Sequence, residues 1–246
     1  MAERKLKLKI AYDGTDYHGW AKQPDKKTIQ SELELAFFKL TNQQIRVHGA
    51  SRTDAGVHAL AQQAACEIDS PIPTENFAKA LSDRLPHDIV VTEVVEVPAA
   101  FDVISDVTGK LYQYTIKTTP FRPVLDIRTC WHLPITLDHD AMNRAASMLV
   151  GKHDFKSFAS AADKRESSVR TIFRCEVTSR DEWIFLDVEG DGFLYNMVRN
   201  IAGTLVEVGR DRLKPEKIAD ILEAKDRCAA GPIAPAAGLC LMWIKY

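Results

Sequence analysis

A carboxylate flanked by an arginine and a glycine is the strongest chemical signal in this sequence. Asp54 lies in the stretch ASRTDAGVHA, residues 50–59. Short apolar segments at 45–48 and 61–68 flank this stretch, so we expect a loop between two strands with Asp54 pointing into a cleft. Arg52 would favour the charged form of the carboxyl group. An ionised, positioned carboxylate can act as a nucleophile or a base.

The same residues also allow a structural interpretation. Asp54-Ala55-Gly56 has the composition of a tight turn, in which the aspartate bonds its own backbone and the glycine takes a positive φ. Spacing alone leaves both interpretations open.

The elements that would position this loop follow from hydrophobic periodicity. Leu6, Leu8, Ile10 and Tyr12 alternate with lysines, which predicts a half-buried strand. A helix is expected after an N-cap at Thr28, and a second helix capped by Thr74 and closed by Pro86. Residues 89–97 predict a further strand, so this half has the order strand, helix, strand, strand, helix, strand of a ferredoxin-like unit.

The second half repeats this kind of pattern. Strands are expected at 111–117, 172–178, 183–189 and 239–245, and helices at 138–150 and 194–208. We therefore predict an α+β protein with two ferredoxin-like halves, residues 1–100 and 101–246, in one extended antiparallel sheet with helices on one face. The first half carries the Asp54 loop.

Bulk composition restricts the class of protein. With 46% apolar residues and a net charge of -2, the chain reads as an ordinary globular protein, in which RNA binding would need a local basic groove. We expect no membrane span, because no long apolar stretch occurs. Five cysteines without a Cys-x-x-Cys pair suit a reducing compartment, so we expect a cytoplasmic protein.

Several ordered segments resemble one family, the tRNA pseudouridine synthase A family. The stretch RTDAGVHA at 52–59 is similar to the family's signature, whose aspartate is its nucleophile. The other matching segments are YDGT with Gly19-Trp20, KLYQY at 110–114, HDFKSF at 153–158, RTI at 170–172, GFLYNMVRNI at 192–201, AAGP at 229–232 and AAGL at 236–239. The resemblance covers essentially the whole chain.

The resemblance implies an activity and a fold. A family member isomerises uridine to pseudouridine in the tRNA anticodon stem-loop, at positions 38, 39 and 40, on the pseudouridine synthase fold. It implies no cofactor and no metal, and a homodimer across which tRNA binds. The target base would have to leave its stack to reach a buried carboxylate. The route of Asp54 stays open among attack on C1′, addition to C6 and removal of a sugar proton.

The resemblance also assigns roles to residues beyond the Asp54 loop. Arg199 would pair with the catalytic aspartate and join Asp54 and Arg52 as a catalytic residue. Tyr112 and Leu239 would contact the target base, and His58 would bind substrate. Without the resemblance, Tyr112 and Leu239 read as core residues and Arg199 as a solvated helix charge. His58, Lys22, Arg46 and Arg52 could line an RNA groove.

Three positions depart from the family pattern. Ser51 stands where the family has glycine, which predicts modest backbone strain if that position needs a positive φ. Asp102 and Ile104 stand where the family commonly has His and Arg, which leaves the affinity for tRNA less defined than the chemistry.

Other functions leave weaker traces. GDGFLY at 190–195 lacks the third glycine of a dinucleotide fingerprint, and no histidine spacing is typical of zinc. A noncatalytic tRNA-folding module and a nucleoside glycosidase are the alternatives, although a glycosidase needs a second acid that is not evident.

Overall fold

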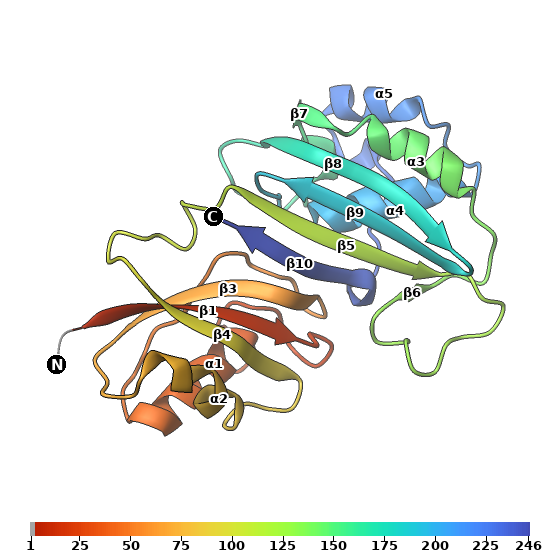
Figure 1. The fold of residues 1–246 in the computed structure, drawn as a ribbon. Helices are drawn as coiled ribbons and strands as arrows, with labels where there is room; N and C mark the ends of the chain where they lie inside the picture. The colour runs from red at the N-terminus through yellow and green to blue at the C-terminus, as the bar shows by residue number, and fades with distance from the viewer. Residues whose placement is uncertain (1–2) are drawn as a thin grey trace. The chain divides into compact units, whose positions relative to one another are not determined.

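The computed structural model describes residues 3–246, and these form two compact units. The first contains the described residues up to Thr108 together with Leu241–Tyr246, and the second contains Gly109–Cys240. Each unit combines helices with antiparallel strands (Figure 1), so the predicted α+β class is confirmed. No helix within residues 3–246 is both long and apolar enough to cross a membrane.

The first unit has the predicted order of elements. They are β1 (Arg4–Tyr12), α1 (Ile29–Thr41), β2 (His48–Gly49), β3 (His58–Ile68), α2 (Thr74–Ser82) and β4 (Ile89–Val97). Strand β1 lies between β3 and β4 and is antiparallel to both, while β2 is only two residues long and pairs with β3. Strand β10 (Leu239–Lys245) lies beside β3 and returns the chain to this unit.

The core of the first unit explains why β1 forms. Its alternate residues Leu6, Leu8 and Ile10 are completely buried, and the lysines between them stay partly exposed. Phe37 of α1 and Phe77 of α2 are also completely buried, with ring centroids 6.4 Å apart. Burying each such side chain stabilises the fold by about 1.5–3 kcal/mol.

The two helices of this unit begin differently from one another. Thr28 is the N-cap of α1 as predicted, and it forms a reciprocal capping box with Ser31. The prediction that Thr74 caps α2 is wrong, because Pro73 is the N-cap and Thr74 is the first helical residue. The Thr74 hydroxyl accepts a hydrogen bond from Arg4 and donates one to Glu96 instead.

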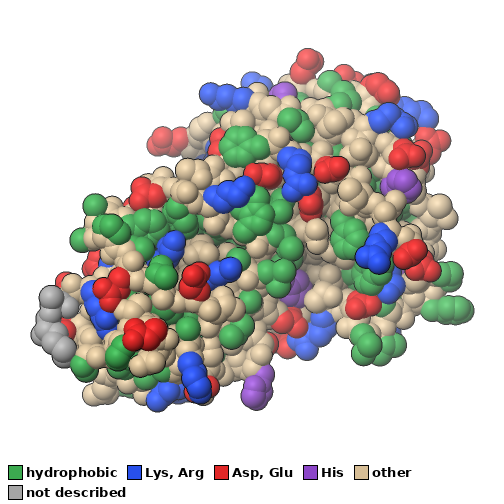
Figure 2. All heavy atoms as spheres, viewed as in Figure 1, with side chains coloured by type: hydrophobic (Ala, Val, Ile, Leu, Met, Phe, Trp, Pro, Cys, Tyr) green, Lys and Arg blue, Asp and Glu red, His purple; other side chains and the backbone are tan. Residues whose placement is uncertain are grey.

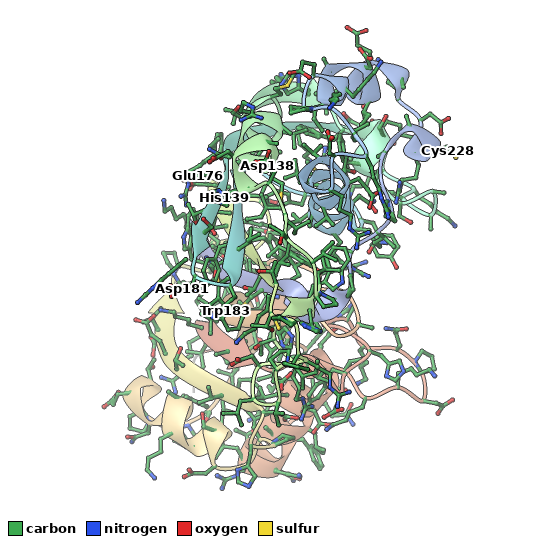
Figure 3. The ribbon with its side chains drawn as sticks, turned by 90° about the vertical axis from the view of Figure 1, so that its right-hand side faces the viewer. Asp138, His139, Glu176, Asp181, Trp183 and Cys228 are labelled. Atoms are coloured by element: carbon green, nitrogen blue, oxygen red, sulfur yellow. The ribbon has the colours of Figure 1, made fainter. Side chains whose placement is uncertain are left out.

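The second unit is also a sheet with helices. Its elements are β5 (Gly109–Lys117), β6 (Trp131–His132), α3 (His139–Ser147), β7 (Gly151–Asp154), β8 (Val169–Arg180), β9 (Trp183–Gly190), α4 (Met197–Gly209) and α5 (Lys217–Ala224). The strand order is β5-β9-β8-β7, and only β6 pairs in parallel, with β5, among the described pairs. Strands β8 and β9, where strands were predicted at 172–178 and 183–189, form an antiparallel hairpin with Asp181 and Trp183 at its tip (Figure 3).

Candidate active site

Asp54 opens a tight turn immediately before β3. The Val57 amide donates to the Asp54 carbonyl at 3.1 Å, and Gly56 has a φ of 77°. A positive φ at the third position is typical of a type II turn, which needs glycine there. The turn that Asp54-Ala55-Gly56 predicts is therefore formed. It places Asp54 four residues before the start of β3, with a partly exposed side chain.

The loop of residues 13–20 after β1, here called the opening loop, packs directly on this turn. The Trp20 amide donates to the Thr53 carbonyl at 3.1 Å, and the Gly56 amide donates to the Tyr17 carbonyl at 3.3 Å. Gly19 has a φ of 86°, and a Cβ there would lie 2.6 Å from the Thr53 carbonyl oxygen. Only glycine allows this approach without displacing the backbone beside Asp54.

Buried hydrogen bonds anchor the Asp54 loop from beneath. The Tyr12 hydroxyl and Thr53 Oγ1 are 2.8 Å apart, and both residues are buried. The Gln62 side chain, fully buried on β3, donates to the Ser51 carbonyl at 2.7 Å and accepts from the Ser51 amide at 3.3 Å. These bonds fix the backbone on both sides of Arg52. A positioned carboxylate needs such fixed surroundings.

Ser51 lies in a backbone region that is compatible with its Cβ, so the strain that a positive φ would have brought does not arise. Within residues 3–246, the non-glycine residues with positive φ are Asp25, Asn42, Asp181, Asn196, Asp211 and Lys225. Ser51 is not among them, so its Cβ does not cause the steric strain that the left-handed region would bring.

The expected ion pair between Arg52 and Asp54 is absent. Arg52 is exposed, and within the described part of the chain it makes no ion pair and no side-chain hydrogen bond. Thr53 turns inward to Tyr12, which leaves Arg52 in solvent, where an arginine–carboxylate pair gains little energy. Arg52 is therefore not what holds the Asp54 carboxylate.

His58 is buried beneath the opening loop, with only 6% of its surface exposed. Its Nδ1 accepts a hydrogen bond from the Gly14 amide at 3.1 Å and also lies 3.1 Å from Oδ1 of Asp13. One nitrogen cannot accept from Gly14 and donate to Asp13 at once, so the two contacts require different positions of the proton on the ring. His58 thus supports the loop that braces Asp54.

In the second unit, Tyr112 lies on β5 opposite Val188 and is 6% exposed. Its ring meets the Phe193 ring edge to face, with centroids 5.3 Å apart and an interplanar angle of 89°. Such aromatic pairs add about 0.5–1.5 kcal/mol beyond the area that they bury. The tyrosine is therefore held in one orientation.

Arg199 lies in the first turn of α4, and its guanidinium is held rather than solvated. Its Nε donates to the Ala234 carbonyl at 2.8 Å, and a terminal nitrogen donates to Asn196 Oδ1 at 3.3 Å. The N-cap Asn196 has a φ of 63°, so α4 begins at Met197 and not at Leu194 as predicted. These contacts orient the planar guanidinium group.

Leu239 opens β10 and is 5% exposed. The segment before it is fixed by Tyr114, whose hydroxyl donates to the Pro235 carbonyl at 2.7 Å. A Cβ at Gly238 would lie 2.6 Å from the Tyr114 ring. In the first unit, Arg52 and Asp54 thus lie in the loop before β3 and His58 is the first residue of β3. Tyr112, Arg199 and Leu239 lie in the second unit.

The sequence analysis did not single out Lys110 and Asn196, which are close in the chain to Tyr112 and Arg199. Lys110 is two residues before Tyr112 on β5, and burial lowers its pKa to about 8 with help from the Arg165 charge. The sequence signal for Lys110 was its position on β5, where it lies on the same strand face as Tyr112. Asn196 could be suspected only as a residue that tolerates positive φ. Within residues 3–246, no group of three or more His, Cys, Asp and Glu side chains is arranged to hold a metal ion.

Comparison with known proteins gives a consistent result. The chain matches the family described as tRNA pseudouridine synthase over residues 9–105 and 145–246. It is 46% identical over 245 residues to tRNA pseudouridine synthase A 2 of Clostridium tetani (strain Massachusetts / E88), covering 99% of each chain. It is 44% identical over 243 residues to tRNA pseudouridine synthase A of Acetivibrio thermocellus, covering 99% of this chain and 100% of the relative.

A likeness among solved structures is weaker. A chain from the crystal structure of a Cbf5-Nop10-Gar1 complex aligns with 96% of this chain and 56% of its own, at 11% identity and a TM-score of 0.34. That value is too low to establish a common fold. The sequence relatives, however, are similar over their full length. The chain therefore belongs to the tRNA pseudouridine synthase family of isomerases.

Proposed function

We propose that this protein isomerises uridine to pseudouridine at positions 38, 39 and 40 of the tRNA anticodon stem-loop, with Asp54 as the nucleophile. Full-length similarity to relatives named tRNA pseudouridine synthase A supports tRNA as the substrate. The observation that carries the role of Asp54 is its place on a hydrogen-bonded turn that Gly19, Thr53 and Gln62 brace.

The chemistry balances without a cofactor. The N1–C1′ bond breaks, the uracil turns, a C5–C1′ bond forms, the C5 proton leaves and N1 gains a proton. Substrate and product are isomers, so neither an oxidant nor an energy donor is consumed. Attack on C1′, addition to C6 and removal of a sugar proton all require an ionised Asp54 beside an everted nucleotide. Eversion costs a few kcal/mol, which contacts to the base and the backbone must offset.

We assign the other residues supporting roles in the same reaction. Arg199, anchored through Ala234 and Asn196, would orient and stabilise the aspartate, and Arg52 would assist from solvent by meeting RNA phosphate. Tyr112 would stack on the everted base, and Leu239 would pack against it. His58 would act on substrate binding through the opening loop that it supports.

We also propose a homodimer. The loop between β5 and β6, residues 118–130, exposes Phe121, Val124 and Leu125, which are 86%, 81% and 93% exposed. Figure 2 shows hydrophobic side chains projecting where Figure 1 draws this loop. Several large apolar side chains exposed in one loop favour a protein interface. A second copy of the chain is the partner that we favour.

Two further proposals concern organisation. Residues 1–100 and 101–246 would be the two ferredoxin-like halves, the first carrying Asp54 and the second carrying Tyr112 and Arg199. We also propose a cytoplasmic location, because the buried thiols Cys66, Cys130 and Cys175 suit a reducing compartment.

The decisive experiment compares two conservative variants on unmodified tRNA. Asp54→Asn is expected to abolish pseudouridine formation and leave tRNA affinity within a few fold. Asp25→Asn is the matched control, because Asp25 is an exposed acid of the same unit. Pseudouridine mapping reports activity and position together. Wild-type activity in Asp54→Asn would refute the assignment, tRNA binding without product would favour a folding module, and free uracil would indicate a glycosidase.

A further inference from the structure

Arg227, in the short 3₁₀ turn after α5, binds three uncharged oxygens. One terminal nitrogen of its guanidinium donates to the Gly231 carbonyl at 2.9 Å and to the Ala230 carbonyl at 3.3 Å. The other donates to Oδ1 of Asn200, a residue of α4, at 3.0 Å. A planar guanidinium has donors on several sides, so it can join acceptors that belong to different segments. Arg227 thus links the segment that follows its own turn to α4.

The acceptor on α4 is itself fixed. Asn200 is 1% exposed, and its side-chain nitrogen donates to the Phe158 carbonyl at 2.7 Å. The amide group therefore has one defined orientation, with its nitrogen toward this carbonyl and its oxygen toward Arg227. Because Asn200 directly follows Arg199, the guanidinium of Arg227 contacts α4 one residue away from the arginine that we assign to the reaction.

Two glycines allow the AAGP stretch at 229–232 to lie directly against α4. A Cβ at Gly203 would be 1.7 Å from the Pro232 carbonyl oxygen, and a Cβ at Gly231 would be 2.7 Å from Cα of Thr204. The Gly231 amide also donates to Thr204 Oγ1 at 3.0 Å. Glycine is the residue that permits such a close approach of two backbones. The stretch is therefore seated on the helix from both sides of the contact.

Two hydrogen bonds then join the next part of this segment to Arg199. The Ala234 amide donates to the Arg199 carbonyl at 3.1 Å, and Nε of Arg199 donates to the Ala234 carbonyl at 2.8 Å. Residues 230–235 form neither helix nor strand, so contacts from other segments must fix them. Arg227 supplies such contacts at the beginning of the segment, and the Tyr114 hydroxyl supplies one at its end. The direction of the Arg199 guanidinium therefore depends on Arg227.

We propose that Arg227 is a positioning residue for the isomerisation and that it acts through Arg199. The inference rests on the proposed function, which gives Arg199 its role toward Asp54. Arg227 would keep the Ala234 carbonyl at the place where Nε of Arg199 donates to it. Small displacements of a catalytic group lower a rate strongly, whereas a residue that does not touch RNA leaves its affinity unchanged. The rate at saturating RNA should depend on Arg227, and the affinity for RNA should not.

The test measures the single-turnover rate of the full-length protein at saturating, unmodified anticodon stem-loop RNA. Arg227→Ala is expected to lower this rate about tenfold without changing the affinity for RNA. Arg199→Ala should lower the rate by itself, and adding Arg227→Ala should lower it no further, because the residue through which Arg227 acts is then gone. Arg227→Lys should restore part of the rate, since an ammonium can still donate to a carbonyl. Arg212→Ala is the matched control, because Arg212 is an exposed arginine beyond the other end of α4 that pairs with Glu207.

Thr204→Val supplies an independent arm, because it removes the hydroxyl that accepts from the Gly231 amide. Its loss of rate should also vanish when Arg199 is already alanine, and melting temperatures identify variants that fail to fold. An equal fold-loss from Arg227→Ala with Arg199 present and absent would overturn the positioning role alone. Weaker RNA binding with a smaller slope of log K against log salt would overturn it in favour of a phosphate contact. Absence of pseudouridine in the wild type would instead refute the proposed function.

Discussion

The hydroxyl of Tyr12 lies 2.8 Å from Oγ1 of Thr53, and both side chains are buried. Because Thr53 precedes Asp54, this contact ties the proposed nucleophile to the last residue of β1. The position of the Asp54 carboxylate thus depends on β1, the strand that the alternation of apolar residues and lysines predicts clearly. A bond this far from the reacting atoms can still affect a rate, because small displacements of a catalytic group are costly.

Tyr12→Phe should separate positioning from binding. The change leaves Thr53 Oγ1 without this buried partner, which we expect to lower the free energy of unfolding by about 1–2 kcal/mol. The single-turnover rate should fall several-fold, with tRNA affinity unchanged. Urea unfolding and rapid-quench kinetics measure both. Thr53→Val completes a double-mutant cycle, and full additivity of the two changes would contradict a direct coupling.

Gly19→Ala should damage the Asp54 loop more than its local strain alone would. Its Cβ would strike the Thr53 carbonyl in addition to taking an unfavourable φ, so we expect a loss of more than about 1–2 kcal/mol and at least a tenfold lower rate. Gly151→Ala is the matched control. It has a φ of 116°, but its Cβ would approach only the His153 side chain. Equal loss of activity in the two variants would argue against steric control at Gly19.

Two buried thiols should make the free energy of unfolding decrease as the pH rises in the alkaline range. Burial raises the pKa of Cys66 and of Cys175 to about 12. An unfolded thiol ionises near pH 8.5, so above that pH the unfolded state binds fewer protons, and the free energy of unfolding falls as the pH rises toward 12. The expected loss is about 2 kcal/mol per thiol by pH 10.

Chemical denaturation at pH 7.5 and pH 10 measures this loss, and Cys175→Ala should reduce it relative to the wild type. A thiol reagent should modify the exposed Cys228, which lies at the margin of the view in Figure 3, well before it reaches Cys66 or Cys175. Rapid reaction of Cys66 in the native protein would contradict its burial.

Charged substitutions in the apolar loop should weaken self-association. Leu125→Asp with Phe121→Asp places two carboxylates in the proposed interface, so we expect a monomer in analytical ultracentrifugation with little change in melting temperature. Ile104→Asp alters an exposed apolar residue of the other unit, 59% exposed, and should leave the oligomeric state intact. A wild-type protein that sediments as a monomer at all concentrations would refute the dimer.

Periodicity predicted the elements well where one face is buried. The alternation in β1 and the Thr28 cap of α1 both correspond to the structure. Strands as short as β2, β6 and β7 carry no such pattern. Thr74 and Leu194 show the limits at helix ends. The Thr74 hydroxyl donates to Glu96 of the neighbouring strand β4 and does not cap the helix. The left-handed backbone of Asn196 makes α4 begin at Met197, so Leu194 lies outside the helix.

The candidate site was predictable in composition and less so in geometry. The Asp54 turn follows from its own residues, because a glycine at the third position specifies the turn. The direction of the Arg52 side chain depends on Thr53 turning inward to Tyr12, forty-one residues away in the chain. The hold on Arg199 comes from a backbone carbonyl at Ala234, which no side-chain pattern encodes.

The last strand carries a consequence for synthesis. Residues from Leu241 onward belong to the first unit, where the Tyr246 hydroxyl donates to the Val103 carbonyl and the Thr108 amide donates to that of Lys245. The unit that is synthesised first thus lacks its last strand segment until residues 241–246 have been made. Deleting residues 241–246 would therefore destabilise the unit that carries Asp54, although these residues follow the second unit in the chain.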